Sequence, residues 1–221
     1  KGEQYGVLTA ILYLSPASSS GVNMCAMAEI ASCIAACLNT AGRGGMFKRG
    51  ETTNVIQKAR IRKTRYFYDD RAGFMFDLMQ DIKKGIRLAN KLGLEPVFRL
   101  NGTSDLSWEK YEMTEGKNVF DVFAGIQFYD YTKVLGRKVK HIENYHLTFS
   151  KADGNDSDVA EALLQGMSVV AVYDKIPAGV PSADLDDLRF LDPKGIMLGL
   201  KAKGRAKKDY TGFVIRVAEA A

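Results

Sequence analysis

The sequence lacks several patterns that mark large classes of protein. No run of eighteen apolar residues occurs in its 221 residues, so we expect no membrane-spanning segment and no membrane partner. A G-x-S-x-G nucleophile motif and a G-x-x-x-x-G-K-[ST] phosphate-binding loop are both missing, which argues against a serine hydrolase and a P-loop nucleotide hydrolase. No exact internal repeat is present, and the length predicts one α/β domain over residues 1–221.

Cysteine is scarce, and its placement excludes a disulfide framework. The chain has three cysteines, which cannot all pair with one another, and all of them fall within the stretch from Ser15 to Gly45. Clustered unpaired thiols favour a reducing compartment, so we expect a cytoplasmic protein, in a host cell if it is phage-encoded.

The three cysteines could share one metal centre. Seven residues separate Cys25 from Cys33 and three separate Cys33 from Cys37, so Cys33 and Cys37 are predicted one turn apart on a helix, with Cys25 in the preceding loop. Three thiolates suit a [4Fe-4S] cluster with one iron left open, or a zinc ion with a fourth ligand from elsewhere. Inert core thiols are the third interpretation, because the segment is rich in Ala, Ile and Met.

Apolar and β-branched runs predict six buried strands separated by helical or long crossing segments. This pattern is typical of a right-handed βα array, which forms either an open doubly wound sheet or a partial barrel. We favour a partial (β/α)6 TIM-like barrel with parallel strands and helices outside. The loop 15–45 then follows the first strand. The expected strands are Val7–Leu14, Glu95–Leu100, Ile126–Tyr131, Asn144–Phe149, Ser168–Tyr173 and Ile196–Leu200, and Gly212–Val217 is a candidate closing strand. The main helices are expected over Thr53–Tyr68, from Asp69-Asp70 to Leu92, and over Asp156–Leu164.

Polar residues follow the strands where a barrel opens. The carboxyl ends of parallel strands form the ligand-binding mouth of such folds. Lysines after the third to sixth strands predict an electropositive rim, made by Lys133, Lys151, Lys175, Lys201 and Lys203. The second strand delivers Arg99 and a glycine-relieved turn that could hold the amino and carboxylate groups of a small ligand: Asn101, Gly102, Thr103, Ser104 and Asp105. A satisfied polar turn that caps a short helix at Ser107–Tyr111 is an equal alternative.

A second metal site is conceivable on neighbouring strands. Asp130, Asp105 and His146 could bind a metal for phosphodiester chemistry, provided that His146 faces the lumen. A histidine at such a position more often has a structural, hydrogen-bonded role than a role as a metal ligand.

Positive charge is concentrated in two stretches. Arg43 to Arg65 holds eight basic residues and the single acid Glu51, and Lys201 to Lys208 holds five basic residues and no acid, so the rest of the chain is acidic. Two basic patches imply an anionic partner, such as a nucleotide or nucleic acid. For the first patch, a solvated helix face is an equal alternative.

Several segments resemble an uncharacterised family of phage- and plasmid-borne three-cysteine proteins. They include SGVNMCAMAEIASCIAACLNTAGRGG, KTRYFYDDRAGFM, VFRLNGTSDLSWE, QFYDYTK, NYHLTFS and LRFLDPKG. More distantly, the chain is similar to the radical S-adenosylmethionine superfamily, whose three cysteines bind a four-iron cluster after the first strand. There, a polar glycine motif after the second strand holds the amino group of the cofactor, and Asn101–Asp105 stands in that place here. The superfamily spaces its cysteines by three and then two residues, so the longer spacing here predicts a different loop path.

Two functions follow from these observations. The first is a radical S-adenosylmethionine-like enzyme, with the cluster on Cys25, Cys33 and Cys37, the cofactor on Asn101, Gly102, Ser104 and Asp105, and an anionic substrate on Arg99 and the rim lysines. The second is a non-redox nucleic-acid-binding or nuclease protein with structural cysteines. Its phosphate contacts would be Arg60, Arg62, Lys63, Arg65 and the segment Lys201–Lys208.

Overall fold

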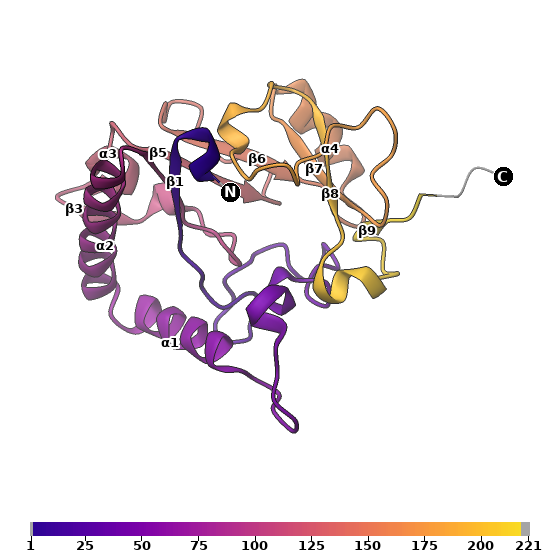
Figure 1. The fold of residues 1–221 in the computed structure, drawn as a ribbon, viewed down its shortest axis with the longest axis horizontal. Helices are drawn as coiled ribbons and strands as arrows, with labels where there is room; N and C mark the ends of the chain where they lie inside the picture. The colour runs from indigo at the N-terminus through magenta and orange to yellow at the C-terminus, as the bar shows by residue number, and fades with distance from the viewer. Residues whose placement is uncertain (1, 218–221) are drawn as a thin grey trace.

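A computed structural model describes residues 2–217 and contains a curled half-barrel of six parallel strands (Figure 1). Each strand pairs with the next in chain order, which is the arrangement of a partial TIM-like barrel, so the predicted fold is confirmed. The strands are β1 (Val7–Ile11), β2 (Glu95–Arg99), β5 (Gln127–Thr132), β6 (Tyr145–Ser150), β7 (Val169–Tyr173) and β8 (Met197–Lys201).

Helices cover the outer face of the sheet and begin and end where the capping residues predict. The Asn54 side chain caps α1 (Val55–Asp69), and Asp70 caps α2 (Arg71–Leu92), which ends at left-handed Gly93. Phe74, Leu78 and Ile82 of α2 pack in one core with outward side chains of the strands, including Phe98 and Phe128. The helix α4 (Asp156–Leu164) matches its predicted bounds, and α3 (Val119–Val122) is a single turn. Among residues 2–217, no helix is long and apolar enough to cross a membrane.

The inner face of the half-barrel is covered by the chain itself. Val97 and Tyr129 alternate with the outward Phe98 and Phe128, and they cluster with Leu188 and Phe190. These last two residues lie at η5 (Arg189–Leu191), in the connection between β7 and β8. This connection therefore fills part of the barrel interior and leaves the carboxyl ends of the strands as the open end.

Two small elements complete the sheets. The strand β9 (Val214–Ile215) pairs in parallel with β7, within the segment expected to close the sheet. The hairpin of β3 (Glu112–Thr114) and β4 (Lys117–Asn118) was not predicted. Its turn places Glu115 and Gly116 at positive φ, the backbone of a two-residue hairpin loop, but Glu-Gly is a weak sequence signal for such a turn.

The cysteine segment contains no α-helix, so the prediction that Cys33 and Cys37 lie one turn apart on a helix is wrong. Ser32 adopts a positive φ of 50°, which interrupts a right-handed helix immediately before Cys33. Tertiary contacts hold this conformation, because the Ser32 hydroxyl donates to Asp153 Oδ2 at 3.1 Å. The segment runs as successive turns into the 3-10 helices η2 (Leu38–Thr40) and η3 (Gly42–Gly45).

Candidate functional site

A cavity of about 410 Å³ opens at the carboxyl ends of the strands. Its wall combines the cysteine segment, the turn after β2, the ends of β5 to β8, and the segments that flank β8. The volume lies within the range of small-molecule sites. The cavity therefore occupies the place at which half-barrel folds bind ligands.

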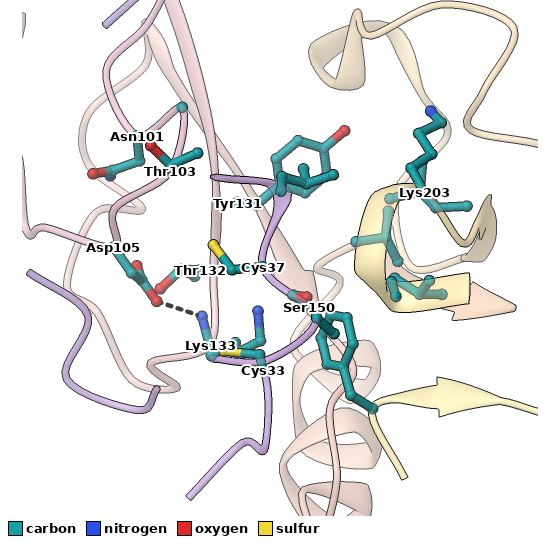
Figure 2. A pocket seen from close by; sticks show the side chains of 18 of the residues that line it. Cys33, Cys37, Asn101, Thr103, Asp105, Tyr131, Thr132, Lys133, Ser150 and Lys203 are labelled. Atoms are coloured by element: carbon teal, nitrogen blue, oxygen red, sulfur yellow. Dashed lines mark hydrogen bonds between the residues drawn. The ribbon is translucent and has the colours of Figure 1, made fainter. Parts of the chain in front are cut away.

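All three cysteines line this cavity. Each is half-buried and none forms a disulfide. Cys25 Sγ accepts a hydrogen bond from the amide of Ala17 at 3.4 Å and donates to the carbonyl of Thr103 at 3.8 Å. Figure 2 shows Cys33 and Cys37 on one side of the same space, opposite Thr103 and Asp105. The turns of the loop thus place all three side chains on the cavity wall, but within residues 2–217 they do not gather them into a metal-binding group.

Burial favours the neutral form of the Cys25 and Cys37 thiols by raising the pKa of each. Burial raises the pKa of Cys25 to about 11, and the neighbouring Cys37 adds to the increase. Burial also raises the pKa of Cys37, against a smaller lowering by Lys133 and Arg60. A bound cation would reverse this balance, because thiolates are the form that binds metals.

No group of three or more His, Cys, Asp or Glu side chains within residues 2–217 is arranged to hold a metal ion. The prediction that Asp105, Asp130 and His146 form a metal site is therefore wrong. His146 lies beside Tyr129 on the inner face, whereas Asp130 faces outward and accepts a hydrogen bond from Tyr145 Oη at 3.1 Å. Alternation along the strands separates the two side chains by the sheet itself.

Asn101 organises the turn after β2 from within. Its Oδ1 accepts hydrogen bonds from the Ser104 hydroxyl, the Leu106 amide and the Trp108 indole at 2.9 to 3.1 Å. Its amide nitrogen donates to the Leu106 carbonyl and to buried Asp130. Asn101 lines the cavity, but its polar atoms are already engaged, so its side chain shapes the turn rather than presenting a free donor.

Asp130 anchors this turn from the outer face. Its Oδ1 accepts the Asn101 backbone amide at 2.6 Å, and burial raises the pKa of its carboxyl group to about 7. The residue has no exposed surface, so its role is positional.

Asp105 closes the turn against the next strand. Its Oδ2 accepts the backbone amide of Lys133 at 2.8 Å, as drawn in Figure 2. Its Oδ1 is buried and lies 3.9 Å from Arg137 Nη1, but it accepts no hydrogen bond from residues 2–217. Arg137 is itself ion-paired with Glu109. One carboxylate oxygen of a cavity-lining residue is thus left with acceptor capacity.

Not every rim lysine faces the cavity. Lys133, Lys201 and Lys203 line it, and Gly102, Ser104 and Arg99 line it as well. Lys151 does not, because its ammonium pairs with Asp156 at the start of α4. Lys175 is exposed outside the cavity wall.

The mouth is also less electropositive than predicted. Four aspartates line the cavity beside its four basic residues, and three of them, Asp184, Asp186 and Asp187, come from the segment between β7 and β8. Asp187 pairs with Arg99 at 3.0 Å and accepts the Tyr131 hydroxyl at 2.8 Å, and Asp184 pairs with Lys203. The acidic composition of this segment was visible in the sequence, but its return across the mouth was not.

Lys133 keeps its positive charge free of ion pairs within residues 2–217. Its ammonium lies 5.4 Å from the centre of the Phe213 ring, and Ser150 lines the cavity nearby (Figure 2). Sequence reasoning missed Ser150, Tyr131 and Phe213 as wall residues. The first two sit at the carboxyl ends of β5 and β6 on the inner face, whereas Phe213 is placed only by the return of the chain after β8.

One comparison with known proteins gives a match. The model of the family described as Gene product 88 matches residues 1–217, which confirms the expected phage-type family. No curated protein and no solved structure matches the chain, so the likeness to the radical S-adenosylmethionine superfamily stays a prediction.

Proposed function

The chain belongs to the Gene product 88 family, and we propose that it is an iron–sulfur enzyme of the radical S-adenosylmethionine type that acts on an anionic substrate. One observation carries the proposal. Cys25, Cys33 and Cys37 line a single cavity, together with the turn after β2, at the carboxyl end of a parallel half-barrel.

The donor set fits a cluster better than it fits inert packing. Core thiols are expected to point apart into apolar surroundings, but these three border a cavity that holds acidic, basic and hydroxyl groups. No group of three or more His, Cys, Asp or Glu side chains among residues 2–217 is already arranged around a metal, so either a zinc ion or a cluster requires the cysteines to move together on binding. A four-iron cluster is larger than one ion, so its three thiolates stand farther apart and suit a wide cavity.

The turn after β2 supplies the groups for a small cofactor. Asp105 has one carboxylate oxygen, Oδ1, that accepts no hydrogen bond within residues 2–217 and pairs with Arg137 Nη1 at 3.9 Å. Asn101 and Asp130 fix the turn that carries it. When bound, a cluster with S-adenosylmethionine would supply one-electron chemistry.

The charged side chains of the wall indicate where an anionic substrate would bind in the cavity. Lys133 lies where an anionic group would meet its ammonium, with the Ser150 hydroxyl as a second polar contact. Arg99 and Lys203 also line the wall, but their charges are offset by Asp187 and Asp184. Among the basic side chains of the cavity, Lys133 and Lys201 form no ion pair within residues 2–217 and are therefore the candidates for substrate recognition.

The test is anaerobic purification and reconstitution, followed by iron quantitation and absorbance near 400 nm. We expect a brown protein with about four irons per chain. The variants Cys25→Ser, Cys33→Ser and Cys37→Ser are each expected to lose most of this iron. Lys48→Ala, in the exposed loop before α1, is the control and should load fully. A colourless wild-type protein that takes up no iron would end the proposal.

A further inference from the structure

We propose that the surface beside the cavity mouth binds single-stranded nucleic acid. We call this region the basic surface. It consists of η3, the loop that follows η3, and η6 (Gly204–Lys208). Its exposed cations are Arg43, Lys48, Arg49, Arg205, Lys207 and Lys208.

Folding joins the two basic stretches of the sequence at this place. Gly204, at a positive φ of 57°, lies so close to Thr40 that a Cβ on it would stand 2.9 Å from the Thr40 carbonyl oxygen. Ala206 of η6 is buried in one cluster with Ala31 and Ala36 of the cysteine segment. Figure 1 shows η6 in yellow beside the violet cysteine segment. Residues about 160 positions apart thus contribute to one surface.

The charges of this surface are not neutralised by the protein. None of the six cations has an ion-pair partner within residues 2–217, whereas the buried Arg99, Arg137 and Arg189 are all paired. The loop also holds one exposed acid, Glu51, which accepts the backbone amide of Lys48. The excess of exposed cations over this single acid attracts a polyanion through the release of its counterions. Arg60, one of the predicted phosphate contacts, is not available, because it is buried and donates to Asn39 Oδ1 at 2.6 Å.

An aromatic ring stands next to the cations. Tyr210 is 83 % exposed, and the guanidinium of Arg216 lies 4.4 Å from its ring centre. An exposed ring that follows a basic segment is the combination that single-strand binders use to stack bases without reading their sequence.

The extent of the surface favours a chain over a single phosphate. The loop between η3 and α1 extends away from the body in Figure 1, while Lys203 and Ala206 at η6 border the cavity itself. A strand bound along this surface would pass the mouth, and the cavity volume could accept one nucleotide. If the bound strand is also the substrate of the cavity, the inference rests on the proposed function. Binding of the strand to the basic surface itself requires no cluster.

The experiment measures fluorescence anisotropy of a labelled 20-nucleotide DNA single strand of mixed sequence, with cluster-free protein, from 50 to 300 mM KCl. We expect a steep salt dependence, with a log–log slope of about −3 to −4 for five or six phosphate contacts. Lys207→Ala with Lys208→Ala should make the slope shallower by about 1.4, because two contacts are lost. Tyr210→Ala should weaken binding about 10-fold at every salt concentration.

The double variant Lys83→Ala with Arg87→Ala removes the same charge from the exposed side of α2 and serves as the matched control. Equal slopes for the two double variants would overturn the proposal, since binding would then follow net charge alone. Absence of binding at 50 mM KCl would overturn it too, and so would full competition by equimolar ATP. Iron loading is measured separately, so failure of the cluster and failure of nucleic-acid binding are distinguishable.

Discussion

The backbone of Cys25 pairs with that of Asp105 in an isolated parallel bridge across 80 residues of sequence. The Asp105 amide donates to the Met24 carbonyl at 2.9 Å, and Cys25 Sγ reaches the Thr103 carbonyl from the same side. The backbone therefore fixes the first cysteine beside Asp105. A ligand that bridges the cysteines and this turn would meet groups whose positions are set by the backbone.

Gly102 makes this arrangement possible, and its replacement is expected to destabilise the protein. A Cβ at this position would lie 2.6 Å from the Tyr13 ring and 2.7 Å from the Leu12 carbonyl oxygen. Gly102→Ala should lower the free energy of unfolding in urea by about 1–3 kcal/mol. Gly125→Ala is the control, because Gly125 is exposed and a Cβ there meets no atom within 4 Å. Equal stability of the two variants would contradict the close approach of β1 and the turn.

Lys133 is expected to control the reactivity of Cys37. Its charge offsets part of the increase that burial imposes on the pKa of Cys37. Lys133→Met should therefore raise that pKa further and slow alkylation of Cys37 by iodoacetamide at pH 8 by about 3-fold or more, since the thiolate is the reacting form. Mass spectrometry of the three cysteine peptides measures the rates. Lys175→Met removes an exposed strand-end lysine outside the cavity and should leave the rate unchanged.

His146 makes the protein sensitive to acid. Burial, with the charges of Lys194 and Arg189, lowers the pKa of His146 to about 4, below its usual value of 6.5. Between these two values the unfolded chain binds a proton that the folded protein excludes, so stability falls as the pH drops from 6.5 to 4. Thermal unfolding across this range should show a smaller loss of melting temperature for His146→Gln than for the wild type. His141→Gln, at an exposed position, is the control, and a wild-type-like curve for His146→Gln would refute the assignment.

Local signals predicted most of the secondary structure. The runs of apolar residues located all six parallel strands, and Asp70 and Gly93 marked the two ends of α2 that the structure confirms. The prediction succeeded where one segment carries its own periodicity and its own caps. It failed in the cysteine segment, where helical spacing is present but Ser32 is held at positive φ by Asp153 from the connection after β6.

The predictions for the candidate site succeeded and failed for the same reason. The sequence alone determined that the cysteines, the turn Asn101–Asp105 and Lys133 all follow strands, and parallel strands end at one edge of a sheet. Only the tertiary structure decided which of these groups remain available. Asn101 is engaged by four neighbours, Lys151 turns to Asp156, and the acidic segment before β8 returns to neutralise Arg99 and Lys203. These partners are far apart in sequence or lie in irregular segments. A pattern can therefore place a side chain at the mouth, but the long-range contacts of the folded chain determine whether its charge is free.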